Sequence, residues 1–129
     1  LPGSGGGADI ASLSQRLAII MAHDRKRFPE RVSFITSPGY GDGGDWRQRV
    51  GLPRGGPSVV ITTLGTLGFA PDTHEMELRS WRPDVTADDV RVNTGWELRF
   101  APDAQPAPAP TDDELRIIHE CDPQGFWTR

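Results

Sequence analysis

The amino-acid sequence predicts an α/β fold in which helices flank an open mixed sheet. Residues 58–64, near the middle of the chain, form a β-branched and almost continuously apolar run, as a strand covered on both faces does. Residues 75–81 and 96–100 alternate apolar and polar side chains, which is typical of half-buried strands. Helical patterns before and between these runs favour an α/β sheet over an all-β sandwich.

The first helix is predicted directly after the glycine-rich residues 3–7. Asp9 stands where an N-cap or first-turn acid belongs, and the segment 23–31 is basic and contains Pro29, as suits a helix that is ending. An apolar stripe with the spacing i, i+3, i+7 and i+10 indicates that the helix runs through to this segment. The stripe consists of Ile10, Leu13, Leu17 and Ile20.

The glycine cluster itself has two interpretations. Glycines at a terminus often form a flexible leader. Glycines before a helix can instead bring backbone N–H groups close to a negatively charged group. The spacing of the residues leaves both interpretations open.

The next segments predict a short strand and a long loop. Residues 32–36 resemble a strand closed by the turn residues 37–39. Residues 39–56 are rich in glycine but also carry aromatic and arginine side chains, which favours a site-forming loop over a spacer. An ordered surface loop with a half-buried Trp46 is the alternative.

The second half of the chain alternates strand and helix patterns. Residues 75–81 place Met76 and Leu78 on one face, and we expect this strand to pair with 58–64 through the turn at 70–73. Thr86 and Asp89 have capping-box spacing, which predicts a short helix that ends near Thr94.

A linker and a last helix complete the predicted organisation. Residues 102–110 read as a Pro/Ala linker with polyproline II character. Thr111 and Glu114 form a capping box, and the helix that follows should face inward with Leu115 and Ile118, with Cys121 as a further candidate.

Length, charge and cysteine content limit the function classes. The 129 residues suit one domain, and the net charge of −4 argues against a nucleic-acid partner. A single cysteine excludes an intrachain disulfide framework, and the sequence has no long apolar run and no signal pattern, so we expect a cytoplasmic protein. Because Leu1 is not a methionine, we expect a fragment or a processed product.

The residues offer no complete catalytic apparatus. The histidines do not have the spacing of zinc ligands, no phosphate-binding P-loop is present, and no metal site is predicted. Ser4 lacks the preceding strand that a nucleophile elbow requires. The acid pairs Asp88-Asp89 and Asp112-Asp113 occupy helix-cap positions that already explain them. The histidines are His23, His74 and His119.

A series of motifs resembles a known family. In order, they are GSGG-x-x-DIAS, ITSPGY, GLPRGGPSVVIT-x-LG-x-x-GF, V-x-x-NTGW-E-L, PT-x-x-EL-x-x-I and DPQGFW. From residue 3 to residue 127 the chain resembles the beta subunit of class I CoA-transferases, in the glutaconate CoA-transferase-like branch. The resemblance implies a CoA-transferase-like fold and makes residues 1–129 the C-terminal part of such a subunit. It also implies two partners, the N-terminal half of the beta subunit and an alpha subunit, in a heterodimer or heterotetramer.

The resemblance also assigns roles to residues. It implies that the backbone N–H groups of Gly5 and Gly6 hold a thioester oxyanion, with Gly7 where relatives carry other residues, and this favours a site over a flexible leader. The family's nucleophilic glutamate belongs to the upstream half, because no acid in this chain has the Ser-Glu-Asn-Gly-like neighbours of that residue. The loop arginines could bind CoA phosphates or a substrate carboxylate, or could simply be solvated. They are Arg47, Arg49 and Arg54.

The activity that the resemblance implies is CoA transfer between carboxylic or dicarboxylic acids. The substrate is then a coenzyme A thioester, with no metal or other cofactor. Repurposed branches leave two alternatives: an acyl-CoA hydrolase, as in steroid-ring breakdown, or a decarboxylase of an unsaturated dicarboxylic acyl-CoA of the methylglutaconyl-CoA type, as in isovaleryl-CoA biosynthesis. A non-catalytic scaffolding paralogue is the third.

Overall fold

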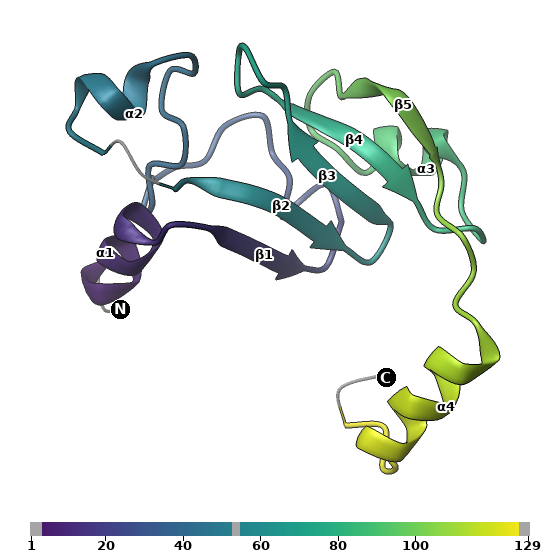
Figure 1. The fold of residues 1–129 in the computed structure, drawn as a ribbon. Coiled ribbons are helices and arrows are strands. Elements are labelled where there is room, and N and C mark those ends of the chain that lie inside the picture. Colours follow the sequence, from purple (N-terminus) through teal and green to yellow (C-terminus); the bar gives the residue numbers. More distant parts are fainter. Residues whose placement is uncertain (1–3, 53–54, 127–129) are drawn as a thin grey trace.

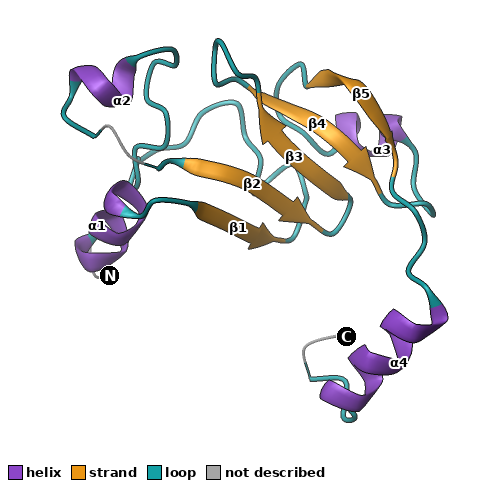
Figure 2. Cartoon of the chain, in the orientation of Figure 1, coloured by secondary structure: helices purple, strands orange, loops and turns teal. Residues whose placement is uncertain are grey.

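The computed structural model describes residues 4–52 and 55–126. Within these residues the elements are α1 (Gly5–Leu13), β1 (Leu17–Met21), α2 (Trp46–Arg49), β2 (Pro57–Thr62), β3 (Gly65–Phe69), β4 (Met76–Trp81), α3 (Ala87–Val92), β5 (Arg99–Pro106) and α4 (Asp112–Cys121). The strands form one mixed sheet in the order β1-β2-β3-β4-β5, with α1, α2 and α3 beside it and α4 standing apart (Figures 1 and 2). The predicted α/β fold with an open mixed sheet and flanking helices is confirmed.

The connections explain the mixed topology. β2, β3 and β4 follow one another as antiparallel neighbours, joined by short turns. Thr62 stabilises the first turn, since its Oγ1 accepts the N–H groups of Leu64 and Gly65. β1 pairs in parallel with β2, and β4 with β5, so each pair needs a long crossover. The two crossovers are residues 22–56, which contain α2, and 82–98, which contain α3.

One face of the sheet carries the hydrophobic core. Leu67 and Leu78, from adjacent strands, are completely buried, and Val90 of α3 packs with them. Apolar side chains from the crossovers close the cluster. The full set is Phe28, Val60, Leu67, Leu78, Val90 and Leu98.

The predicted first helix is too long. α1 ends at Leu13, and Leu17 and Ile20 lie in β1. The apolar run 17–21 satisfies its backbone groups by parallel pairing with β2, and this long-range pairing overrides the helical spacing of its side chains. The helix also starts earlier than predicted, because its N-cap is Ser4, so it begins within the glycine cluster, and Asp9 lies inside it.

Three strand predictions also need correction. Residues 32–36 form irregular backbone with bends and belong to none of the strands of the sheet. β4 pairs with β3, which the sequence did not reveal, and not with β2. The third predicted strand, 96–100, starts at Arg99 and runs through the first half of the predicted linker to Pro106. Two prolines fit there because β5 is an edge strand, where a missing backbone N–H can face away from the sheet.

The capping boxes at Thr86 and Thr111 are confirmed. The Thr86 Oγ1 accepts the Asp89 N–H at 3.1 Å, and an Asp89 oxygen accepts the Thr86 N–H at 2.7 Å. The helix that begins after Thr111 differs from the prediction on one point. α4 stands away from the sheet (Figure 1), and none of its residues is buried, so the expected inward packing of its apolar face is wrong within this chain. The residues concerned are Leu115, Ile118 and Cys121.

Candidate functional site

The first turn of α1 consists of three glycines. The Ala8 N–H donates to the Ser4 carbonyl at 3.2 Å, so the N–H groups of Gly5, Gly6 and Gly7 precede the first intrahelical bond. Ser4 makes no side-chain cap bond, and the first turn contains no acidic side chain. N–H groups at the positive end of a helix dipole favour an anion or a developing oxyanion.

The backbone around these glycines is sterically open. An added Cβ at Gly5, Gly6 or Gly7 meets no described atom within 4 Å. Gly5 has a φ of 41°, in the left-handed region that side chains rarely adopt, whereas Gly6 and Gly7 lie outside that region. The described fold therefore has room for a side chain at Gly6.

Arg47 fixes the other end of α1. Its side chain is buried, and its guanidinium donates to the carbonyl oxygens of Gly39 at 2.6 Å and Ser12 at 2.7 Å. Gly55 approaches the same end so closely that a Cβ would lie 1.7 Å from the Ser14 oxygen. Residues 39–52 and 55–56 thus pack with α1 at the N-terminal ends of β1 and β2 (Figure 1).

A small hollow lies between this loop and the turn that connects β3 and β4. It measures about 110 Å³ and lies beside Tyr40, whose hydroxyl donates to the Pro57 carbonyl at 2.7 Å. The ring of Tyr40 stacks on His74, and burial raises the pKa of the tyrosine, while the nearby Arg47 charge opposes that rise. These contacts connect the loop to the start of β2 and to the turn between β3 and β4. The lining residues are Tyr40, Gly44, Arg47, Gln48, Gly55 and His74.

The predicted site residues do not form one cluster. Arg47 contacts Ser12, near the C-terminal end of α1. With a helical rise of 1.5 Å per residue, Ser12 lies about 9 Å along the helix axis from Gly6. Arg49 is exposed on α2, and its Nε donates to Asp45 at 2.9 Å. Arg54 lies outside the described residues. The roles of these arginines and of Gly5 and Gly6 remain predictions.

A buried histidine is a feature that the sequence analysis missed. His23 is 6% exposed and stacks on Phe28, with 4.0 Å between the ring centroids. Its Nδ1 lies 3.1 Å from the Thr62 hydroxyl, and its Nε2 lies 3.1 Å from the Thr94 hydroxyl. His23 and Thr62 meet because the carboxyl ends of the parallel strands β1 and β2 adjoin, which only a strand assignment of residues 17–21 would have indicated.

Burial lowers the pKa of His23, and the nearby Asp24 charge only partly opposes this effect. The His23 imidazole therefore binds a proton more readily in the unfolded chain than in the folded protein. Below about pH 6.5 this difference lowers the free energy of unfolding. We expect the thermal midpoint of the complete subunit to fall as the pH decreases from about 7.5 to 5, and His23→Gln to weaken that dependence. The exposed His119 is the matched control, and an equal effect of His119→Gln would contradict the assignment to His23.

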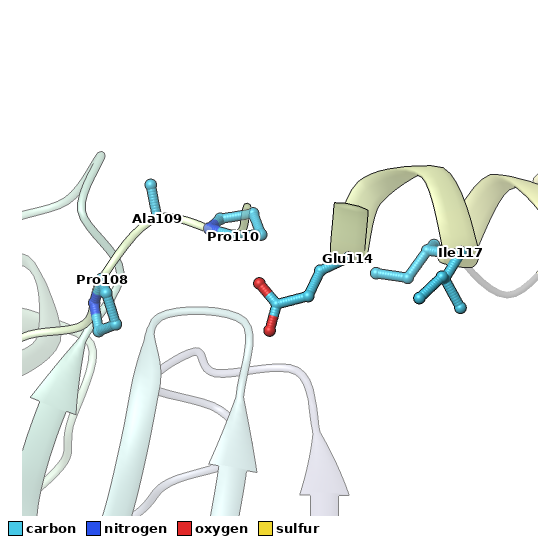
Figure 3. A pocket seen from close by; sticks show the side chains of 6 residues that line it. Pro108, Ala109, Pro110, Glu114 and Ile117 are labelled. Carbon is cyan, nitrogen blue, oxygen red and sulfur yellow. The ribbon is translucent and has the colours of Figure 1, made fainter. Parts of the chain in front are cut away.

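An apolar groove of about 490 Å³ lies between the segment before α4 and α4 itself (Figure 3). The carboxylate of Glu114 at its rim accepts the Thr111 N–H at 2.8 Å and the Thr111 hydroxyl at 2.9 Å, so Glu114 caps the helix.

Within residues 4–52 and 55–126, no group of three or more His, Cys, Asp or Glu residues could hold a metal ion. None of the described helices has the length and apolar content that a membrane span requires.

Comparison with known proteins identifies the family. Residues 1–93 match the sequence profile described as Coenzyme A transferase. The chain belongs to the coenzyme A transferase family. The resemblance drawn from the motifs is thereby confirmed.

Relatives and solved structures agree with this family. The 3-oxoadipate CoA-transferase of Pseudomonas knackmussii has a subunit that is 39% identical over 118 residues, which are 92% of this chain and 45% of the relative. A glutaconate CoA-transferase subunit from Acidaminococcus fermentans is 39% identical over 119 residues, 92% of this chain and 44% of the relative. The crystal structure of that glutaconate enzyme matches with a TM-score of 0.88 at 35% identity, over 100% of this chain and 50% of that chain.

The chain spans about half the length of these CoA-transferase relatives. IpdAB of Rhodococcus jostii RHA1 matches with a TM-score of 0.78 at 27% identity, over 98% of this chain and 50% of that chain. The decarboxylase AibA/AibB shares only 16% identity, so its TM-score of 0.72 shows the fold alone.

Proposed function

We propose that this coenzyme A transferase family chain is the C-terminal part of the beta subunit of a CoA-transferase. The complete enzyme contains the N-terminal half of the same subunit and an alpha subunit, as a heterodimer or heterotetramer in the cytoplasm. It transfers CoA from an acyl-CoA thioester to a free carboxylic or dicarboxylic acid. The observation that carries the proposal is the match to the glutaconate enzyme over the whole chain.

In this proposal the first turn of α1 stabilises the transition state. Attack on a thioester carbonyl moves negative charge onto the carbonyl oxygen, and preorganised N–H donors stabilise that charge. Gly5 and Gly6 supply such donors at the positive end of a helix dipole, in a turn with no acidic side chain. The nucleophile is expected in the upstream half, as a glutamate that carries the acyl group and then CoA.

Acyl-CoA hydrolysis is the second candidate. The cholesterol ring-cleaving hydrolase IpdB subunit of Rhodococcus jostii is 39% identical over 71 residues, which are 54% of this chain. That match is shorter than the matches to the two CoA-transferase subunits, so transfer is the first proposal. Decarboxylation rests on likeness of fold alone and is not favoured.

Transfer and hydrolysis differ in their need for an acceptor. The complete beta subunit, purified together with its alpha subunit, is incubated with a dicarboxylic acyl-CoA, with and without a free dicarboxylic acid. We expect a new acyl-CoA, separated by chromatography, that forms only with the acceptor and without release of free CoA thiol. Thiol release that does not depend on the acceptor would replace transfer by hydrolysis, and release of carbon dioxide would replace it by decarboxylation.

A further inference from the structure

The turn between β3 and β4 holds His74 in an uncommon backbone conformation. Its φ is 58°, and in the described part of the chain it is the one residue other than glycine with a positive φ. Its N–H donates to the Ala70 carbonyl at 2.9 Å, and the Ala70 N–H donates to the Glu75 carbonyl at 2.9 Å. Histidine adopts this left-handed region more often than most side chains do. The two bonds therefore close the turn and set the direction in which the imidazole leaves it.

A stack of rings restrains the imidazole. The His74 and Tyr40 rings lie 4.2 Å apart, centroid to centroid, at an interplanar angle of 26°. Tyr40 is itself held, because its hydroxyl donates to the Pro57 carbonyl and its ring lies 5.1 Å from that of Phe69. Gly56 approaches so closely that an added Cβ would lie 2.9 Å from Cε1 of Tyr40. The imidazole therefore has little freedom to turn toward another partner.

The Nδ1 atom of His74 is buried but makes no hydrogen bond within the described chain. Among the partly or fully buried side chains of residues 4–52 and 55–126, it is the one buried nitrogen or oxygen without a partner. A buried polar atom left in this way costs about 1–3 kcal/mol, and the large majority of such atoms in native proteins are bonded to protein or to ordered water. We therefore expect a partner in the space beside this nitrogen.

The hollow of about 110 Å³ between the loop and the turn lies beside His74. One water molecule takes about 30 Å³ in the liquid, so the hollow has room for about three. Buried water needs several polar neighbours. The Gln48 amide can donate and accept, and the Tyr40 hydroxyl, which donates to a backbone carbonyl, can still accept. The loop and the turn also touch directly, since the Gly44 N–H donates to the Thr73 carbonyl at 3.2 Å.

Size and charge argue against other occupants. Sites for cofactors and drug-sized molecules measure about 300–1,000 Å³, so the hollow is too small for CoA. A small anion is the competing occupant, because Arg47 lines the hollow. The Arg47 guanidinium, however, already donates to the Gly39 and Ser12 carbonyls at 2.6 and 2.7 Å, and no other described lining residue is a lysine or an arginine.

We propose that ordered water fills this hollow and that one molecule is hydrogen-bonded to the Nδ1 of His74. Because water both donates and accepts, it satisfies this nitrogen in either tautomer of the ring. The same water connects the turn between β3 and β4 to the loop before β2. The inference goes beyond the proposed function and does not depend on which reaction the enzyme catalyses.

A crystal structure of the complete enzyme, from crystals grown without phosphate or carboxylate salts, tests the site directly. We expect a water oxygen about 2.7–3.2 Å from the His74 Nδ1, with a further polar contact to the loop. Density that places a protein group from the rest of the enzyme beside Nδ1 would overturn the proposal. So would well-resolved density with no peak at that position.

His74→Phe removes the ring nitrogen but keeps a flat ring that can stack on Tyr40. In crystals of the complete enzyme with this substitution, we expect the water beside residue 74 to be lost, because its main partner is gone. His119→Phe is the matched control, since His119 is exposed on α4, and it should keep that water. A water that stays in place in His74→Phe would show that Nδ1 does not hold it and would overturn the proposal.

Inorganic phosphate distinguishes water from an anion in the hollow. Titration calorimetry with phosphate compares the complete wild-type enzyme with His74→Phe. We expect the two proteins to give the same result, because an uncharged occupant leaves no phosphate site that depends on His74. Phosphate binding to the wild type that His74→Phe abolishes would assign the hollow to an anion and overturn the proposal.

Discussion

Gly6→Ala is expected to lower kcat for CoA transfer by on the order of 10²-fold or more, with little change in the KM for the acyl-CoA. In the role proposed for Gly6, the added methyl group would lie where the thioester oxygen approaches, so the N–H donor would no longer come within the 2.7–3.1 Å that oxyanion stabilisation requires. The fold itself should not suffer. The Gly6 Cβ meets no described atom within 4 Å, and alanine is the better helix former by roughly 1 kcal/mol.

Gly7→Ala is the matched control for this effect. It adds the same methyl group one position further along the same turn, also without a described neighbour within 4 Å. We expect it to keep near wild-type kcat and thermal stability. The measurements are steady-state kinetics and thermal melting of the complete enzyme. Wild-type turnover in Gly6→Ala, or an equal loss in Gly7→Ala, would show that the Gly6 N–H does not hold the oxyanion.

Arg47→Met is expected to destabilise the complete beta subunit by about 2–4 kcal/mol. Methionine fills part of the volume but cannot donate to the Gly39 and Ser12 carbonyls that the guanidinium now satisfies. Leaving two such acceptors without these donors costs about 1–3 kcal/mol each where they stay buried. Loss of the tie to Ser12 should also loosen α1 and lower kcat through the position of its first turn.

Arg49→Met on the same helix separates structure from substrate binding. Arg49 is exposed and pairs with Asp45, a type of contact that contributes little to stability, so this variant should unfold at nearly the wild-type denaturant concentration. Urea denaturation and the KM values for acyl-CoA and free acid are measured for both variants. Wild-type stability of Arg47→Met combined with a raised KM would give Arg47 a binding role instead.

Features that depend on neighbouring residues were predictable from the sequence. The capping boxes at Thr86 and Thr111 need only a hydroxyl and an acid three positions apart, and both formed as expected. Most of the predicted strand 58–64 forms, as β2 (Pro57–Thr62), because its β-branched run suits few other structures. The glycine-rich helix start is local in the same sense, and so is the family resemblance, which rests on contiguous motifs.

Contacts between distant segments decided the rest. Leu17 and Ile20 have helical spacing, but they form a strand because β2, some forty positions away, satisfies their backbone groups. Pro106 belongs to a strand because β5 lies at an edge, a fact that exists only once the sheet is assembled.

The same division holds for the candidate site. The sequence by itself determined the family, the presence of a helix next to the glycines and the set of arginines from which a site could be drawn. Only the tertiary structure separated buried Arg47, 35 positions from its Ser12 acceptor, from exposed Arg49, and only it brought His23 to Thr62 and Thr94. The physical reason is that burial and hydrogen-bond partners are set by chain segments far apart in sequence, whereas propensity and capping act within a few residues.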